Sequence, residues 1–277
     1  QTRSQSGYAD GSGTLKLALK LATIAAVILA GVLLFRHLDS AEAARETPET
    51  LEIQLMTSLP IIWGEGASLG DILSDDTPPY PIYSYWQKRY KIEPVDSFEN
   101  LQKSETDIVI LAQPRAMAPA DLADIDAWVR GGGRAIVMTD PALVWPSELP
   151  LGDNRRPLIS GLLSPLLSHW GLELVVLEDM ERAFVELDFG DLKIATAGVG
   201  AFRPLAAKTS ARADCQFSSG NILADCKVGK GRAILIADAD FLHENMWITD
   251  PLWQTEKRSQ AMLMVDQMVR DLTEEEG

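Results

Sequence analysis

The chain has 277 residues, of which 46 % are apolar and 23 % are charged, and this balance is typical of a globular protein with a sizeable core. A net charge of −15 argues against nucleic acid and anionic lipid headgroups as partners of the folded part. Two cysteines are too few for a disulfide scaffold or for a zinc site built from cysteines, and the three histidines form no ligand-spaced motif.

The N-terminal region predicts a disordered start, one transmembrane helix and a linker. Residues 1–14 are mostly polar and are expected to be disordered. Residues 15–35 are long enough to cross a bilayer, and their core, Leu21–Phe35, has no charge and no proline. Lys16 and Lys20 lie on one helix face, so both ammonium groups can reach the membrane interface. Residues 36–50 are polar and charged and form the linker.

Two other interpretations of the apolar segment stay open, namely a buried core helix and a cleaved signal peptide. Ala41-Glu42-Ala43 has the small-x-small form of a cleavage site. The basic residues flanking the segment favour a cytoplasmic N-terminus. We therefore expect a single-pass protein of the inner (cytoplasmic) membrane that contacts lipid through residues 15–35 and carries an extracytoplasmic C-terminal domain.

Residues 51–277 predict one α/β domain. The first half of the domain reads as a strand at 51–56, a loop at 64–81, a helix at 83–90 and strands at 92–95 and 107–112. Pro119 suits the first turn of a helix, and Gly131-Gly132-Gly133 suits its end. A second apolar strand follows at 134–139. Strand, helix and strand with short links form a βαβ unit, which predicts a parallel sheet.

The second half of the domain mixes helices with alternating strands. We expect a helix at 158–170, a strand at 172–177, β structure at 183–208 and 215–238, and a final amphipathic helix at 256–272.

Cys215 and Cys226 are predicted to form a disulfide across a β-hairpin. With Gly220-Asn221 as a two-residue type II′ turn, Cys215 falls opposite Cys226 at a hydrogen-bonded pair, where Cα atoms lie about 5.5 Å apart. An oxidising compartment would let this bond form. Two free thiols packed side by side are the alternative, because a slip of one residue would break the pairing.

Three aspartates follow apolar strands and are candidate metal ligands. Asp140 follows the strand at 134–139, and Asp238 and Asp240 follow the last apolar strand. Because ligands of open α/β sheets bind at the carboxyl ends of strands, the three side chains would converge on magnesium or calcium if these strands are neighbours. The alternative is that Asp140 opens a turn with Pro141 and that the other two cap the following segment.

Three other features have a structural and a functional interpretation. The glycine-rich stretches Gly131–Arg134 and Gly229–Arg232 precede strands, so tight turns are favoured over phosphate loops, which follow strands. Arg155-Arg156 reads as a solvated pair or as an interaction patch. The loop tryptophans pin loops to the core or mark a partner surface; they are Trp63, Trp145, Trp247 and Trp253.

Two segments carry a resemblance to a known family. The stretch AWVRGGGRAIVMTDP and the later stretch KVGKGRAILIADADFLHEN are similar to the extracytoplasmic domains of gliding-motility-type ABC-transporter auxiliary proteins. The resemblance implies a flavodoxin-like, mainly parallel sheet with flanking helices, as in the class I glutamine-amidotransferase fold. The hairpin predicted around Cys215 and Cys226 adds a β-hairpin extension to this sheet. The resemblance also implies membrane-protein complex partners.

Amidotransferase chemistry needs a cysteine on a sharp strand-to-helix turn and a histidine to activate it. The predicted strands ending at Ala112 and Thr139 carry no cysteine at their tips, and no G-x-S-x-G elbow is present. We therefore expect no catalytic residues and no cofactor, and a non-catalytic interaction or ligand-sensing domain auxiliary to an ABC-type transporter. The alternative function is a metal-assisted hydrolase that uses Asp140, Asp238 and Asp240.

Overall fold

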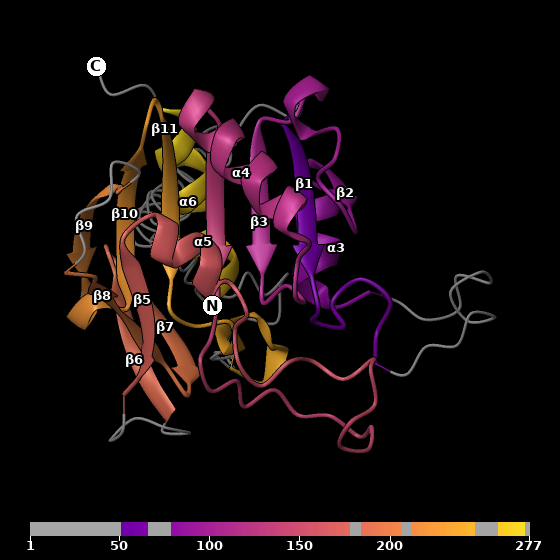
Figure 1. The fold of residues 1–277 in the computed structure, drawn as a ribbon. Helices are drawn as coiled ribbons and strands as arrows, with labels where there is room; N and C mark the ends of the chain where they lie inside the picture. The colour runs from indigo at the N-terminus through magenta and orange to yellow at the C-terminus, as the bar shows by residue number, and fades with distance from the viewer. Residues whose placement is uncertain (1–50, 66–78, 178–183, 207–211, 247–259, 275–277) are drawn as a thin grey trace, which may run out of the picture. The chain divides into compact units, whose positions relative to one another are not determined.

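A seven-stranded sheet with the order β2-β1-β3-β4-β11-β10-β9 organises the domain (Figure 1). The computed structural model describes residues 51–65, 79–177, 184–206, 212–246 and 260–274, all within the compact unit Glu49–Gly277. Strands β2, β1, β3, β4 and β11 pair in parallel, whereas β10 is antiparallel to both β11 and β9. The prediction of a mixed α/β domain with a mostly parallel central sheet is confirmed.

The strands of this sheet are β1 (Glu52–Thr57), β2 (Lys91–Pro94), β3 (Ile108–Ala112), β4 (Arg134–Met138), β9 (Asp214–Ser218), β10 (Leu223–Val228) and β11 (Gly231–Ile236). Two antiparallel pairs stand apart from it, β5 (Leu172–Val176) with β8 (Gly200–Pro204) and β6 (Phe184–Phe189) with β7 (Leu192–Ala197). The α-helices are α3 (Pro81–Gln87), α4 (Pro119–Gly131), α5 (Ser164–His169) and α6 (Gln260–Thr273). Short 3-10 turns are η1 (Leu101–Lys103), η3 (Ser219–Asn221), η4 (Asp240–Leu242) and η5 (Glu244–Met246).

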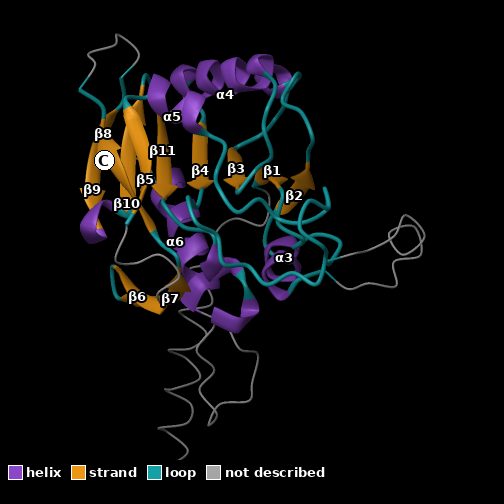
Figure 2. Cartoon of the chain, turned by 60° about the horizontal axis from the view of Figure 1, so that its bottom comes forward, coloured by secondary structure: helices purple, strands orange, loops and turns teal. Residues whose placement is uncertain are grey.

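Helices cover both faces of the parallel strands, and this explains their composition. Figure 2 shows α4 and α5 on one face of the sheet and α3 and α6 on the other. All five residues of β3 are buried, as expected of a strand covered on both faces. The core of the domain is therefore two layers of apolar contact, one on each side of the central strands.

Helix α4 begins and ends where the sequence predicts. Pro119 stands in its first turn, where the missing N–H costs no hydrogen bond. Gly132 follows the last helical residue with φ 128°, a conformation that side chains disfavour, and its N–H donates to the carbonyl of Val129.

A buried carboxylate joins α6 to the region of α3. Asp266 accepts hydrogen bonds from the hydroxyls of Tyr85, at 2.5 Å, and Tyr90, at 2.8 Å. Arg89 Nε lies 3.4 Å from the same carboxylate. Since Asp266 is buried, these donors replace the water that it loses on folding.

Two helix predictions need correction. The predicted helix at 158–170 is only α5, Ser164–His169, because Pro165 belongs to its first turn and cannot stand in the interior of a longer helix. In the preceding stretch the N–H of Gly161 donates to the Asp140 carbonyl instead of to a helical partner. The helix predicted at 83–90 starts and ends earlier, at Pro81 and Gln87, again with proline in the first turn.

Some predictions lie outside the described residues, namely the disordered segment 1–14, the transmembrane helix 15–35 and the linker 36–50. Among the residues that the structure describes, no helix is long and apolar enough to cross a membrane. The finer flavodoxin-like and amidotransferase-like assignments are not established by the topology. Only the 3-10 turn η1, and no α-helix, lies between β2 and β3, and strand β10 runs antiparallel to both of its neighbours, β11 and β9.

The hairpin of β9 and β10 brings Cys215 opposite Cys226, and a disulfide joins them. The turn differs from the predicted type II′, because Ser219, Gly220 and Asn221 all have positive φ and the last strand pair is Ser218 with Leu223. Since hydrogen-bonded and non-hydrogen-bonded pairs alternate along the ladder, this four-residue loop reverses the phase that we expected. The cysteine Cα atoms lie 4.0 Å apart, nearer to the spacing of a non-hydrogen-bonded pair.

We predict that the disulfide is present in protein taken from its native compartment. Denatured, unreduced chain should bind no thiol reagent, and reduced chain should bind it at both cysteines. The double variant Cys215→Ser, Cys226→Ser should lose roughly 2–3 kcal/mol of unfolding free energy, measured by denaturant titration, because the unfolded chain loses a short cross-link. Two labelled cysteines in the unreduced chain would contradict this prediction and the oxidising compartment with it.

Candidate functional site

The carboxyl ends of β4 and β11 bring two distant parts of the chain together. Ile236 is paired with Met138 in parallel register, and the N–H of Thr139 donates to the Ile236 carbonyl at 3.0 Å. Continuing the same register by two residues places Asp140 beside Asp238. Asp240 opens the 3-10 turn η4 directly afterwards.

The three predicted aspartates converge in the interior of the domain. Asp140, Asp238 and Asp240 are all fully buried, and one carboxylate oxygen from each lies within 4.8 Å of the others. This is the arrangement expected if the strands that precede them are neighbours. Among the described residues, these three aspartates form a group whose spacing suits the ligands of a metal ion.

Backbone and hydroxyl donors hold each carboxylate in place. Asp140 Oδ1 accepts from the N–H of Ala142 at 2.7 Å, and Asp240 Oδ2 accepts from the N–H of Val144 at 2.7 Å. Asp238 Oδ2 accepts from the Thr196 hydroxyl of β7 at 2.6 Å. The segment after β4, the turn after β11 and the hairpin strand β7 therefore all meet at this cluster.

Asp238 also receives two longer contacts from its own turn. The N–H of Asp240 lies 3.3 Å from Asp238 Oδ1, and the N–H of Phe241 lies 3.4 Å from Oδ2. Part of the alternative interpretation is thus present, since Asp140 bonds its own turn at Ala142 and Asp238 receives long contacts from the first N–H groups of η4. Asp240 does not cap this turn, because the N-cap residue is Ala239 and the Asp240 carboxylate accepts from Val144. The two interpretations are compatible, because capping uses only some of the oxygens.

Two carboxylate oxygens in the cluster accept no hydrogen bond from a backbone N–H or a hydroxyl group of the described residues, although the carboxyl of Asp140 hydrogen-bonds Asp238 and Asp240 when it is protonated. They are Asp140 Oδ2 and Asp240 Oδ1, and both are buried. Among the described residues, the ion pairs of lysine, arginine and histidine all go to other acids. In the described part of the chain, the donors to the cluster are the N–H groups of its own loops and the Thr196 hydroxyl, which are all neutral.

Burial raises the pKa of all three carboxyls, and the charge of Asp238 raises the pKa of Asp140 and of Asp240 further. Burial, and then the charge of Asp238, raise the pKa of Asp140 to about 10. Burial raises the pKa of Asp238 to about 6, against the opposing effect of the Thr196 hydrogen bond. Burial and the charge of Asp238 raise the pKa of Asp240 to about 7. Without a counterion the cluster retains protons at neutral pH.

Gln113 is a residue of this region that sequence reasoning missed. It follows β3, it is fully buried, and its φ of 44° is unusual for a residue other than glycine. Its side-chain amide donates to the carbonyls of Asp140 and Leu158, both at 3.0 Å, and accepts from the N–H of Asp140 at 2.8 Å. Gln113 thereby fixes the backbone of Asp140. The one signal in the sequence for this role is an amide residue placed between the apolar strand and Pro114.

An aromatic cluster lies beside the turn after β11. The ring of His243 is 4.6 Å from that of Trp145 and 5.7 Å from that of Tyr80, measured between centroids. Burial lowers the pKa of His243, and its Nδ1 accepts from the N–H of Asn245 at 3.1 Å. Trp145 is buried and pins its loop to the core, whereas Trp63 is 47 % exposed. Trp247 and Trp253 lie outside the described residues.

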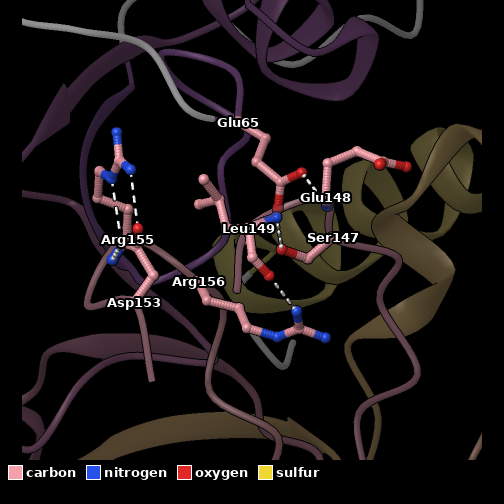
Figure 3. A network of polar contacts seen from close by, with 7 residues as sticks. All are labelled: Glu65, Ser147, Glu148, Leu149, Asp153, Arg155 and Arg156. Carbon is pink, nitrogen blue, oxygen red and sulfur yellow. Dashed lines mark hydrogen bonds and ion pairs between the residues drawn. The ribbon is translucent and has the colours of Figure 1, made fainter. Parts of the chain in front are cut away.

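Arg155 and Arg156 have different roles (Figure 3). Arg155 is exposed and pairs with Asp153 at 2.8 Å, as expected of a solvated residue. Arg156 points the other way and donates to the Leu149 carbonyl at 2.6 Å, so it fixes the loop. The N–H of Glu148 bonds Glu65 at 2.7 Å, which ties this loop to the segment after β1.

The two glycine-rich stretches pack against each other as turns at the opposite end of the sheet. The N–H of Lys230 donates to the Arg130 carbonyl, and the N–H of Arg232 donates to the Gly133 carbonyl. A Cβ on Gly231 would meet the Val129 carbonyl oxygen at 2.1 Å, so this position admits only glycine. His169, the remaining described histidine, lies 3.3 Å from Asp126, far along the chain from the three aspartates.

Comparison with known proteins gives one family match. Residues 50–176, slightly less than half of the chain, match the family model described as an ABC-type uncharacterized transport system. This stretch begins at β1 and ends with β5. No curated protein matches the chain at a significant level.

The solved structures that match this chain are distant. The N-terminal domain of mmIFT52 matches with a TM-score of 0.47 and 13 % identity over 82 % of this chain and 99 % of that domain. An exo-beta-1,4-mannosidase from Opitutaceae bacterium strain TAV5 matches at 0.42 and 12 % over 87 % of this chain, which spans 38 % of the enzyme. A cytoplasmic protein from Salmonella typhimurium LT2 matches at 0.45 and 8 %, over 81 % of this chain and 100 % of that protein. We draw nothing about function from likenesses this distant.

The raised pKa values predict that stability falls as the pH rises when no cation is present. The carboxyls have higher pKa values folded than the roughly 3.9 of an unfolded Asp, so the folded chain holds more protons between about pH 4 and pH 10. In EDTA, the unfolding free energy should drop between pH 7 and pH 9 by up to about 1.4 kcal/mol per pH unit for each proton retained.

Asp140→Asn should flatten this dependence, whereas Asp188→Asn, in the exposed part of β6, should leave it unchanged. The measurement is denaturant unfolding at several pH values above the range where His243 titrates. Equal slopes for the wild-type chain and Asp140→Asn would show that the cluster does not hold the proton.

Proposed function

We propose that the chain is a non-catalytic auxiliary component of an ABC-type transport system, acting through its α/β domain as an interaction or ligand-sensing domain. The observation that carries the proposal is the match of residues 50–176 to that family model. The matched stretch contains β1 to β4, which are four of the five parallel strands, and the long segment between β4 and α5.

The turn after β3 supports a non-catalytic role. A nucleophile on a strand-to-helix turn needs a strained backbone and a free reactive side chain. Gln113 has the positive φ, but its amide is fully used in three hydrogen bonds to the segment around Asp140 and Leu158. The backbone strain at this position serves to brace a loop.

The cysteines and the aspartates do not favour a hydrolase either. Cys215 and Cys226 are joined in a disulfide on β9 and β10, so neither is available as a thiolate. A metal-assisted hydrolase must present its metal-bound water to a substrate. The three aspartates are fully buried, and this leaves no open coordination face. The metal-assisted hydrolase therefore has the required residue types, but a substrate could not reach them.

The domain is proposed to lie outside the cytoplasm, tethered to the inner membrane through residues 15–35, with other membrane proteins as partners. An exposed apolar group supports a partner surface within the matched stretch. Leu151, Ile159 and Leu162 are 80 %, 56 % and 42 % exposed, and all belong to the irregular segment between β4 and α5. Long irregular segments in compact domains are commonly functional.

Tagged full-length chain, purified from native membranes in a mild detergent, should bring down the ATP-binding and permease subunits of an ABC-type transporter. Charged substitutions in the exposed apolar group, Leu151→Asp with Ile159→Asp, should reduce the recovered subunits at least about tenfold, which corresponds to about 1.4 kcal/mol of binding free energy. The matched control is Phe184→Asp, since Phe184 is also 80 % exposed but lies outside the matched stretch. Mass spectrometry that finds no transporter subunit with the wild-type chain contradicts the proposal.

Purified full-length chain should release no ammonia from glutamine and should not hydrolyse simple aryl esters above the buffer rate. The reason is that the strand tips offer no free nucleophile in the described residues. Both assays should be repeated with added Ca²⁺ and Mg²⁺. Turnover that Asp140→Asn or Asp238→Asn abolishes would instead favour the hydrolase.

A further inference from the structure

Hydrogen bonds to the protein orient the three buried carboxylates, and one oxygen of each lies close to an oxygen of the other two. Ala142 and Val144 donate their N–H groups to one oxygen of Asp140 and of Asp240, and the other oxygen of each is buried and accepts no hydrogen bond from a backbone N–H or a hydroxyl group of the described residues. The Thr196 hydroxyl fixes Asp238 in the same way. Ligating carboxylates of metal sites are held by hydrogen bonds of this kind, which set the orientation of the free oxygen.

The charge of the cluster needs compensation, and the described residues supply no positive side chain for it. A buried carboxylate without a partner is costly, and three within a few ångströms repel one another. Either protons or a cation can neutralise them. The N–H groups of Ala142 and Val144 and the hydroxyl of Thr196 each donate to a carboxylate oxygen, and hydrogen bonds of this type favour the charged form of the acid.

We propose that Asp140, Asp238 and Asp240 bind one hard divalent cation, of the calcium or magnesium class, as a closed structural site. The donor set consists of oxygen only, which suits these two ions and not the softer transition metals. Oxygens within 4.8 Å of one another can share an ion that binds each of them at 2.0–2.6 Å.

The bound cation would connect three parts of the fold. It would join the segment after β4, the turn η4 after β11 and, through the Thr196 hydroxyl, strand β7. Because all three carboxylates are fully buried, the site stabilises the carboxyl edge of the sheet and does not act on a substrate. This inference does not depend on the proposed transport function.

The test is calorimetric titration of the full-length chain in mild detergent, stripped with EDTA and dialysed, with CaCl₂ and MgCl₂ in separate experiments. One ion per chain is expected, together with a rise in melting temperature that grows with the concentration of free ion. The two salts distinguish calcium from magnesium. A chain with net charge −15 is also expected to bind cations weakly and without stoichiometry at its surface. Repeating the titration in high salt distinguishes this binding from the buried site, because salt screens exposed charges.

A set of variants links the binding to the cluster. Asp140→Asn should abolish the stoichiometric binding and the thermal response, while the isosteric amide keeps the acceptor for the Ala142 N–H and so preserves the turn. Thr196→Val should weaken binding about 10–100-fold, because it removes the hydrogen bond that orients Asp238. Asp188→Asn, on the exposed part of β6, should bind as the wild-type chain does.

If neither salt gives stoichiometric binding or a thermal shift, the cluster shares protons and the proposal is wrong. Binding that persists unchanged in a folded Asp140→Asn chain would also overturn it, since the ion would then lie elsewhere. Should Asp140→Asn fail to fold, Thr196→Val supplies the same decision, because unaltered affinity in that variant would exclude the site.

Discussion

The parallel pairing of β4 with β11 brings buried carboxylates together, and this constrains how the residues at the carboxyl ends of the central strands pack. The pairing places Asp140 beside Asp238 in a region without solvent, and η4 adds Asp240. Carboxylates this close and this deeply buried are stable only if something neutralises or orients them. The N–H groups of Ala142 and Val144 and the hydroxyl of Thr196 do part of this, and they dictate how the loop after β4 and the hairpin strand β7 must pack.

Gln113, at the end of β3, stabilises the same region by holding the backbone of Asp140. Its strained backbone lets one amide side chain reach both the N–H and the carbonyl of Asp140, together with the carbonyl of Leu158. The long segment between β4 and α5 is thus anchored at its beginning and near its end by a single side chain. Strain of this size, of order 1–3 kcal/mol, persists only when several interactions determine the conformation.

The parts of the fold with strong local signals were predictable from the sequence. The apolar strand at Ile108–Ala112, the helix that follows Pro119 and the strand after the glycines all depend on short-range chemistry. The helix predicted at 158–170 was wrong because apolar spacing was given more weight than Pro165. The pairing of Cys215 with Cys226 followed from counting, although the turn has a different type and reverses the hydrogen-bond phase.

The candidate site was predictable only in part. That Asp140 and Asp238 follow strands is visible in the sequence, but whether β4 and β11 are neighbours is not, because several elements lie between them along the chain. The donors from Val144 and Thr196 and the role of Gln113 arise from tertiary packing. No local pattern encodes such contacts, so the site could be suggested from sequence while its geometry could not.

The disulfide has a consequence for how the sheet meets other chains. Strand β9 stands at one end of the described sheet, where an unprotected strand could be displaced by a strand from another molecule. The covalent link to β10 prevents this exchange. At the other end, β2 is short and carries Lys91, Glu93 and Pro94, which discourage strand addition. At the two ends of the described sheet, the disulfide therefore protects β9 against displacement, and the composition of β2 protects against strand addition.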